Sequence, residues 1–364
     1  MKVKLGNLTK IRTGKLDANA SSENGQYPFF TCSREPLKIS TYSYDCECVL
    51  VAGNGDLNVK YYNGRFDAYQ RTYIIEDNGS GKLYMPYLYY FMEGYIGELR
   101  KQAIGGVIKY IKLGNLTDAL IKLPSIDEQK AIVDILARAR HILNIRKEEI
   151  DNLDNLIKAR FVEMFGDVIH NNRKWKCKQF SDITSSRLGK MLDTKHQTGT
   201  CKYPYLANFN VQWFRFELAD LNEMDFNEKD REEFCLEDGD LLVCEGGEIG
   251  RCAVWHNQVK KCFFQKALHR VRCNQDIILP DYLSWWFKYN CENGGFAAIE
   301  GAKATISHLT GAKMKMLDVT VPPIELQEQF VDFIHQVNKS KVKVQKALDE
   351  TQKLFDSLMQ QYFG

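Results

Sequence analysis

The feature that most constrains the fold is a repeat at a separation of 198 residues. The run Leu123-Pro-Ser-Ile-Asp-Glu-Gln-Lys-Ala-Ile-Val-Asp-Ile-Leu136 recurs as Val321-Pro-Pro-Ile-Glu-Leu-Gln-Glu-Gln-Phe-Val-Asp-Phe-Ile334. At the same offset, and without a gap, Phe165-Gly166 aligns with Phe363-Gly364. Chance is a poor explanation for so long a common register. The chain is therefore expected to build one structural unit twice.

Each copy of this repeat carries a heptad pattern. No proline interrupts either segment, and a proline with Ser125 precedes the first, as at many helix starts. Alternating steps of four and three residues select positions that are apolar eight times out of ten in each copy. These positions are Ile132, Leu136, Ala139, Leu143, Arg146, Ile150, Leu153, Ile157, Arg160 and Met164, and then Phe330, Ile334, Val337, Lys341, Val344, Leu348, Thr351, Phe355, Leu358 and Tyr362. The pattern predicts two helices, each roughly 60 Å long, that form a coiled coil. Two separate amphipathic core helices are the alternative.

The blocks before the two helices match more loosely. Leu5–Leu16 aligns with Phe180–Met191, and Tyr27-Pro28 aligns with Tyr203-Pro204. Short β-type runs alternate with Gly and Asn turns, and each block contains one aromatic helix, marked by Tyr87–Phe91 after Pro86 and by Trp285–Phe287 after Pro280. We expect these rings to be buried rather than to stack on bases. The acidic stretch 217–240 is expected to be a solvated loop and strand edge. The whole pattern indicates an α/β (α+β) fold in four segments: residues 1–123, 124–167, 168–321 and 322–364.

Composition and motifs exclude several classes of protein. The net charge is +2, and no apolar run is long enough to span a membrane. The N-terminal residues lack a secretory pattern, and the eleven cysteines lack zinc spacing, so we expect a cytoplasmic protein with reduced thiols. The only Pro-Pro is Pro322-Pro323, which is no amino-methyltransferase motif. Neither a phosphate-binding loop nor a nuclease motif is present. The sequence thus predicts no catalysis, cofactor or metal site in this chain.

The two helix openings, the run Leu236–Leu242 and the closing Phe165-Gly-Asp167 resemble type I restriction–modification specificity subunits over the whole chain. Leu326 departs from the pattern, because Glu128 holds that place in the first copy. The resemblance implies two target-recognition domains, each reading half of a split site in double-stranded DNA. It also implies an antiparallel coiled coil that sets the spacer and docks two methyltransferase subunits. Restriction subunits would join them, and these partners would use S-adenosylmethionine, ATP and Mg2+.

Candidate DNA contacts are polar residues on the loops that differ between the two blocks, since base edges are read by such side chains. Two turns place cations around a glycine, Arg12-Thr-Gly-Lys15 and Arg187-Leu-Gly-Lys190, where the backbone would approach phosphate closely; a solvated turn is the alternative. Two further loops resemble the family's Gly-rich loop before the helix. The predicted contacts are Arg12, Lys15, Ser33, Arg34, Gln70, Arg71, Lys101, Gln102, Arg187, Lys190, Asn208, Asn210, Gln212, Arg215, Gln265, Lys266, Lys303 and Thr305.

Two other functions stay open from the sequence. A coiled-coil adaptor that binds only protein would keep the helices, but it gives no reason for two blocks with differing loops. A stand-alone DNA-modifying enzyme would need one of the missing motifs. Salt-dependent DNA binding would separate the specificity subunit from the adaptor.

Overall fold

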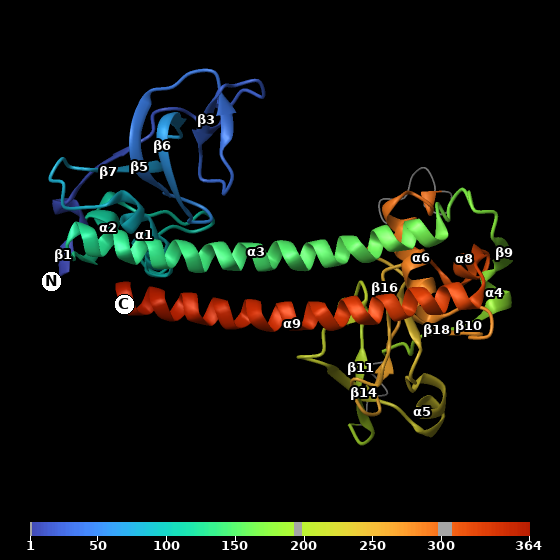
Figure 1. Cartoon of the computed structure of the whole chain (residues 1–364). Coiled ribbons are helices and arrows are strands. Elements are labelled where there is room, and N and C mark those ends of the chain that lie inside the picture. The colour runs from blue at the N-terminus through green and yellow to red at the C-terminus, as the bar shows by residue number, and fades with distance from the viewer. Residues whose placement is uncertain (1, 193–198, 298–307) are drawn as a thin grey trace. The chain divides into compact units, whose positions relative to one another are not determined.

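The computed structural model describes residues 2–192, 199–297 and 308–364. The chain forms two compact units, of which unit 1 comprises Met1–Glu149 with Lys343–Gly364 and unit 2 comprises Ile150–Val342. Two helices have 40 residues each, α3 (Ile126–Phe165) and α9 (Ile324–Phe363). One part of each helix belongs to unit 1 and the other part to unit 2. Figure 1 labels the elements along the chain. The predicted α/β architecture with two long helices is confirmed.

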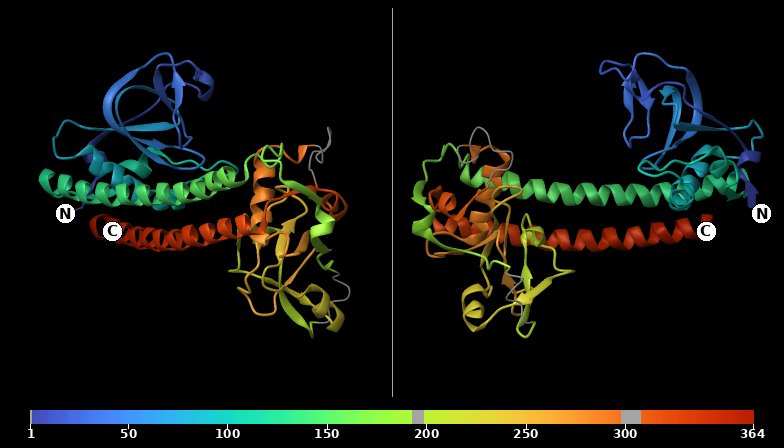
Figure 2. Two further views of the ribbon diagram at one scale, coloured as in Figure 1. Left: turned by 45° about the vertical axis from the view of Figure 1, so that its right-hand side comes forward. Right: turned by 180° about the vertical axis from the view of Figure 1, so that it is seen from behind.

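Unit 1 is built on one six-stranded sheet with the strand order β2-β7-β5-β6-β3-β4, and a small second sheet pairs β1 with β8. The strands and short helices are β1 (Lys2–Lys4), β2 (Thr9–Thr13), β3 (Tyr27–Phe30), β4 (Leu37–Ile39), β5 (Tyr44–Ala52), β6 (Val59–Ala68), β7 (Thr72–Asp77), α1 (Met85–Gln102), α2 (Leu113–Thr117) and β8 (Leu120–Lys122). Helix α1 lies between the sheet and the long helices, as Figures 1 and 2 agree. Pairing is antiparallel except between β3 and β6.

Unit 2 repeats this plan with smaller sheets, ordered β10-β18-β15-β16, β14-β11-β17, β12-β13 and β19-β9. Its elements are β9 (Lys176–Gln179), α4 (Phe180–Ile183), β10 (Thr184–Leu188), β11 (Lys202–Leu206), β12 (Val211–Gln212), β13 (Arg215–Phe216), β14 (Asn222–Asp225), α5 (Glu228–Phe234), β15 (Leu241–Cys244), β16 (Cys252–Val254), β17 (Phe263–Phe264), β18 (Leu268–Cys273), α6 (Pro280–Glu292), α8 (Gly311–Lys315) and β19 (Asp318–Val321). The parallel pair β3–β6 has its counterpart in β11–β17. The structural repeat is therefore present in the frameworks of both units.

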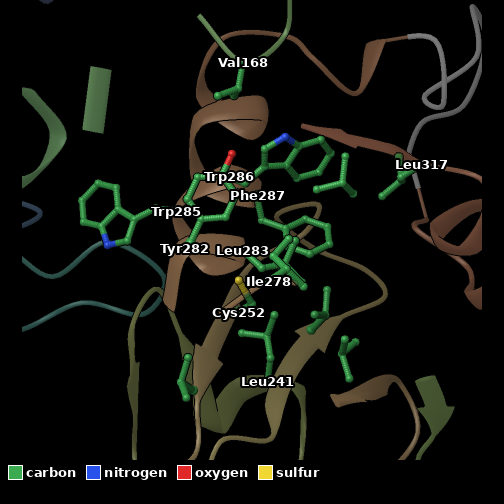
Figure 3. Packing of buried hydrophobic residues seen from close by; sticks show 14 of the residues in the cluster. Val168, Leu241, Cys252, Ile278, Tyr282, Leu283, Trp285, Trp286, Phe287 and Leu317 are labelled. Atoms are coloured by element: carbon green, nitrogen blue, oxygen red, sulfur yellow. The ribbon is translucent and has the colours of Figure 1, made fainter. Parts of the chain in front are cut away.

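The aromatic helices α1 and α6 are buried, as the sequence predicted. Tyr87 on α1 and Tyr282 on α6 are completely enclosed. Figure 3 shows Tyr282, Trp286 and Phe287 of α6 among the apolar side chains of the unit 2 core. The two tyrosines play the same part, because each hydroxyl donates at 2.9 Å to a carbonyl of the strand that leads into a long helix, that of Lys122 or Thr320. Rings so enclosed cannot stack on bases.

In the first turn of each long helix, a buried glutamine makes hydrogen bonds to neighbouring segments of its unit. The fully buried Gln129 amide accepts from the Tyr84 N–H at 2.8 Å and donates to the carbonyls of Lys82 and Pro124. Gln327 makes the equivalent three bonds in unit 2, with Leu279, Ile277 and Pro322. The buried backbone groups before α1 and α6 are thereby satisfied. The repeat at 198 residues thus preserves a polar contact as well as an apolar pattern.

The start of α3 is capped as expected. Glu128 accepts from the backbone and the hydroxyl of Ser125, both at 2.8 Å, and these bonds hold the pKa of Glu128 below its ordinary value. Helix α9 has Leu326 at that place, and this side chain packs against the unit 2 core instead. The second start therefore relies on burial and on Gln327.

In each unit the long helices lie antiparallel. In unit 1 the Arg140 guanidinium lies 5.0 Å from the centre of the Phe355 ring, and Arg146 donates to Thr351. In unit 2 the rings of Phe161 and Phe330 lie 5.5 Å apart. All twenty predicted seam positions are buried or half-buried. The polar seam residues have partners, since Lys341 pairs with Asp154 and Arg160 with Glu163.

The expectation for residues 217–240 holds only in part: most of the acidic side chains are exposed and β14 is an edge strand, but the segment is not merely a surface loop. These residues contribute β14 and α5, and Met224, Phe226 and Phe234 are buried in a core cluster of unit 2. Asp240 is buried as well and accepts from Arg272 at 2.7 Å. Apolar residues between the acids pack into the core and hold this segment in place. The many acidic residues of the segment had suggested a surface loop instead.

Candidate nucleic-acid interface

Four loops of unit 1 meet at one end of its large sheet, and we call them the unit 1 loop cluster. They comprise residues 31–36, 53–58, 69–71 and 103–112. The Gly53 N–H donates to the Arg71 carbonyl at 2.8 Å, and the Gly55 N–H donates to the Lys109 carbonyl at 3.0 Å. The Asn58 amide donates to the Cys32 carbonyl at 2.8 Å. Direct hydrogen bonds therefore join all four loops into one surface.

One carboxylate organises the charge of this cluster. Asp56 accepts from Arg34 at 3.1 Å and from Arg100 at 3.0 Å. The hydrogen bonds from Arg34 and then Arg100 lower the pKa of Asp56. Both guanidinium groups remain more than half exposed. Exposed Arg71, Lys101 and Lys109 add further cations, so the surface suits an anionic partner.

Unit 2 brings together loops at the same topological positions, which we call the unit 2 loop cluster. Its described parts are residues 207–216, 245–251, 265–267 and 308–310. The Glu245 N–H donates to the Ala267 carbonyl at 3.0 Å, and the Leu309 N–H donates to the Glu245 carbonyl at 2.8 Å. The Asn208 amide donates to the Gly246 carbonyl at 3.1 Å. The predicted contacts Lys303 and Thr305 lie outside the described residues.

The two clusters differ in the side chains that they display. Residues 208–216 form a turn and the β12–β13 hairpin, in which Phe214 stacks on Trp285 with ring centres 4.4 Å apart. Phe209 is exposed, and Arg251 donates to both oxygens of Asn208. Unit 1 has no such hairpin among its described residues. Alike frameworks with unlike loops permit two surfaces of different specificity.

Many of the predicted contact residues are accessible. Those exposed in unit 1 are Lys15, Ser33, Arg34, Gln70, Arg71 and Lys101. Those exposed in unit 2 are Arg187, Arg215 and Lys266, whereas Asn208, Gln212 and Gln265 are half-buried. Some accessible groups already have internal partners: Gln70 donates to Asp17 at 2.7 Å, and Arg187 pairs with Glu233. Ser33 donates to the Glu35 carbonyl, and Gln212 to the Phe209 carbonyl.

Four predicted contacts are engaged in holding the fold together. Arg12 pairs with Glu76 at 2.7 Å and lies over the Tyr44 ring. Lys190 donates to Asp230 at 2.5 Å and to the Asp225 carbonyl. Asn210 is only 1% exposed, and its amide bridges the Ala207 N–H and the Glu217 carbonyl. Gln102 bonds with Glu98 and Asn115.

The phosphate interpretation of the two Gly-Lys turns lacks its main support. A Cβ on Gly14 would lie 2.1 Å from the Ala68 carbonyl oxygen, and one on Gly189 would lie 2.4 Å from the Gln265 carbonyl carbon. Both glycines also donate to a strand of their own sheet, to Thr72 and Leu268. Close backbone packing inside each unit therefore explains these glycines.

Sequence reasoning missed Arg100, Lys109 and Arg251. Arg100 is on the last turn of α1, so its pairing with Asp56 depends on a loop 44 residues away in sequence. Lys109 follows Gly105-Gly106, which belongs to one of the two loops that resemble the family's Gly-rich loop. Its position beside these glycines was the signal that could have identified it. Arg251 stands after a Gly-rich run, without any pattern to distinguish it from a solvated cation.

Within the described ranges no group of three or more His, Cys, Asp or Glu side chains is arranged to hold a metal ion. None of the helices described there combines the length and the apolar character required to cross a membrane. His269 is 3% exposed, and burial lowers its pKa, while Glu245 opposes the shift. Its isolation in the core of unit 2 favours a structural role.

The long helices also expose apolar side chains away from the seam, and those on the unit 1 part of α3 form a stripe. The stripe consists of Ile135, Ile142 and Ile145, and the same unit's part of α9 exposes Leu354. In unit 2, Leu156, Val162 and Val342 are exposed. Apolar side chains at helical spacing on a solvent face are typical of a surface that binds a partner helix.

Comparison with known proteins gives relatives for the entire chain. Residues 1–155 and 172–351 match the family model "Type I restriction modification DNA specificity domain". The chain is 39% identical over 156 residues to the type I restriction enzyme EcoDI specificity subunit of Escherichia coli, a match covering 43% of this chain and 34% of that relative. It is 20% identical over 352 residues to a putative type I restriction enzyme specificity subunit of Haemophilus influenzae, covering 92% of this chain and 86% of the relative.

Solved structures share the fold. The S subunit of a type I restriction–modification system from M. genitalium aligns with a TM-score of 0.62 and 15% identity, covering 100% of this chain and 96% of the other. A chain from a structural study of complex assembly and conformational transition of the type I R-M system aligns with a TM-score of 0.61 and 15% identity, covering 100% and 97%. These likenesses show a shared fold, and the match of the family model to residues 1–155 and 172–351 places the chain in the type I restriction–modification DNA specificity family.

Proposed function

We propose that this chain is the DNA-reading subunit of a type I restriction–modification complex and that it recognises a split sequence in double-stranded DNA. Residues 1–123 and 168–321 are the two target-recognition domains, and residues 124–167 and 322–364 are the helices that connect them. The observation that carries the proposal is the loop cluster that occurs twice, on alike frameworks with different side chains. Two such surfaces suit two different half-sites.

Within this proposal, the two kinds of polar residue have different tasks. We assign cations such as Arg71, Lys101 and Lys266 to phosphate contacts that position the protein, and Ser33, Arg34 and Arg215 to base edges. Lys15, Gln70, Arg187, Asn208, Gln212 and Gln265 complete the proposed contact set, together with Lys303 and Thr305. Arg12, Gln102, Lys190 and Asn210 also belong to the predicted set, and like Gln70, Arg187 and Gln212 they would have to exchange internal contacts to bind DNA.

The antiparallel helices act as the ruler between the half-sites. A coiled coil is stiff along its length, so it holds a fixed separation where a flexible linker would permit many. For a pseudo-two-fold arrangement we expect half-site centres about one helical turn of DNA apart, roughly 10 bp. The DNA between them would be held through shape and charge.

Partner subunits supply the chemistry. Two methyltransferase subunits would dock on exposed apolar residues of the long helices, one on Ile135, Ile142, Ile145 and Leu354 and the other on Leu156, Val162 and Val342. Restriction subunits would join this assembly in the cytoplasm. The partners would bring S-adenosylmethionine, ATP and Mg2+, and the present chain would contribute specificity without a cofactor of its own.

Exchange of one recognition domain tests the modular reading. Residues 1–123 are replaced by the corresponding block of another family member, and the chain is co-expressed with its methyltransferase. Sequencing of methylated bases should then reveal a change in one half-site and an unchanged other half. A change in both halves would contradict the proposal that each block reads independently.

Insertion of one heptad into each long helix tests the ruler. A longer spacer, or loss of methylation, is expected because the separation of the two domains would change. The matched control replaces seven surface residues of the same helices without altering their length. An unchanged recognition sequence after the insertion would overturn the ruler proposal.

A further inference from the structure

The loop 103–112 of unit 1 ends in an apolar tip that lies fully in solvent. Val107 has a relative exposure of 104% and Ile108 of 62%. Ile104 and Tyr110, which flank the tip, are exposed as well. Exposed apolar side chains that gather at one place on a surface usually mark a contact with something else. This tip stands in a cluster that otherwise displays charge.

The base of the loop is ordered. The N–H of Ile104 donates to the Tyr110 carbonyl at 3.0 Å, and the N–H of Tyr110 donates back to Ile104 at 2.8 Å. Gly105 has a φ of +120°, a value that an L side chain rarely adopts, and this allows the chain to turn there. The Ile111 N–H donates to the Gly53 carbonyl at 2.9 Å. These bonds hold the tip in place relative to the rest of the loop cluster.

Cations lie on this loop and on the loops joined to it. Lys109 follows it directly, and Lys101 lies at the end of α1 just before the loop. Arg34 and Arg100 approach through Asp56, which adjoins Gly55, the backbone partner of Lys109. An apolar tip with cations on the adjoining loops is complementary to duplex DNA, where phosphates border a stack of apolar base faces. We take duplex DNA as the occupant because the tip belongs to the loop cluster of the proposed DNA-reading surface; a protein partner with an apolar pocket is the other outcome that the test below distinguishes.

We propose that Val107 and Ile108 form a wedge that inserts at a base step of the bound DNA and opens its stacking, while the neighbouring cations hold the phosphates. Apolar wedges of this kind unstack a step and bend the duplex, and the added contacts offset the cost of unstacking. The readout would depend on how easily the step deforms, which adds specificity without a hydrogen bond to a base. This inference rests on the proposed DNA-reading function.

The test uses the full chain in complex with its methyltransferase, bound to a DNA duplex that carries the split sequence methylated by this complex. 2-Aminopurine, whose fluorescence rises when it is unstacked, replaces one base at a time along the duplex. The double substitution V107S/I108S removes the wedge, and L120S is the control, because Leu120 is an exposed apolar residue of unit 1 outside the loop cluster. Affinity is measured over a range of salt concentrations with each protein.

With the unsubstituted chain, fluorescence should rise at one step that V107S/I108S leaves dark, and the double variant should bind about tenfold or more weakly. The slope of log affinity against log salt should stay the same, since no cation is removed. L120S should behave like the unsubstituted chain. A signal from a base flipped by the methyltransferase would persist in the double variant and is thereby distinguished.

Three results would overturn the wedge. Salt-dependent binding without a step that responds to V107S/I108S refutes it and leaves the DNA-reading function standing. Loss of methyltransferase association in the double variant, with unchanged DNA signals, assigns the tip to a protein contact instead. Absence of DNA binding by the unsubstituted complex refutes both the wedge and the proposed function.

Discussion

Replacement of Gln129 or Gln327 by methionine is expected to destabilise one unit at a time. Methionine has a similar volume but leaves three backbone groups without the glutamine amide: in unit 1 the Tyr84 N–H and two carbonyls, and in unit 2 the Leu279 N–H and two carbonyls. A lost hydrogen bond costs about 1 kcal/mol, and a group left buried costs up to about 3 kcal/mol. Three lost bonds at about 1 kcal/mol each give about 2 to 4 kcal/mol in each case.

Native-state hydrogen exchange measures this effect where it occurs. A loss of about 2 to 4 kcal/mol corresponds to exchange roughly 30- to 1000-fold faster at the released amide. Q129M should accelerate the amide of Tyr84 and leave that of Leu279 unchanged, whereas Q327M should do the reverse. The control Q336M alters an exposed glutamine of α9 and should stay within about 0.5 kcal/mol. A loss of less than about 1 kcal/mol in the protection of either amide would refute the assigned role of these glutamines. Equal acceleration of both amides by one substitution would refute it as well.

Three further predictions concern charge, protonation and close packing. D56N removes the carboxylate that accepts from Arg34 and Arg100. Non-specific DNA affinity should therefore rise, and the slope of log affinity against log salt should steepen by about 0.9. An unchanged slope in a salt titration would count against this surface as the DNA contact. Because burial lowers the pKa of His269 in the folded protein, its contribution to stability is present above the ordinary value of 6.5 and is lost as the pH falls below it. H269L should therefore lose less stability than the unsubstituted chain between about pH 7 and pH 5 in denaturant titrations, and an equal loss would argue against the neutral buried ring. G14A should lower the free energy of unfolding by about 1–3 kcal/mol, because its Cβ would collide with the Ala68 carbonyl. G97A, in open space on α1, should raise the free energy of unfolding by up to about 1 kcal/mol. Equal Tm values for the two variants would refute the close-packing explanation.

The long helices could be predicted in detail because their burial repeats with a fixed period. Ile157 and Phe355, for example, were placed at the seam by spacing alone, and both are buried. Periodicity reports which face of a helix meets the core, and that information is local in sequence. The same is true of Tyr87 and Tyr282, whose aromatic neighbours and preceding prolines indicated a buried helix.

The loop residues were harder to predict, since their tasks depend on contacts between distant segments. Nothing near Lys190 in sequence announces Asp230, and nothing near Arg100 announces Asp56. Gly14 has the sequence context of a phosphate loop, yet it is needed because the Ala68 backbone passes close to it. A cation beside a glycine is therefore a weak predictor of a phosphate contact when the partner strand is unknown.

Sequencing of methylated bases in host DNA tests the central claim most directly. Cells express the chain with its methyltransferase, and a matched strain lacks only the gene for this chain. The proposed function predicts one split motif of modified bases in the first strain and its absence in the second. An identical methylation pattern in both strains, with the methyltransferase active, would contradict the claim that this chain selects the sequence.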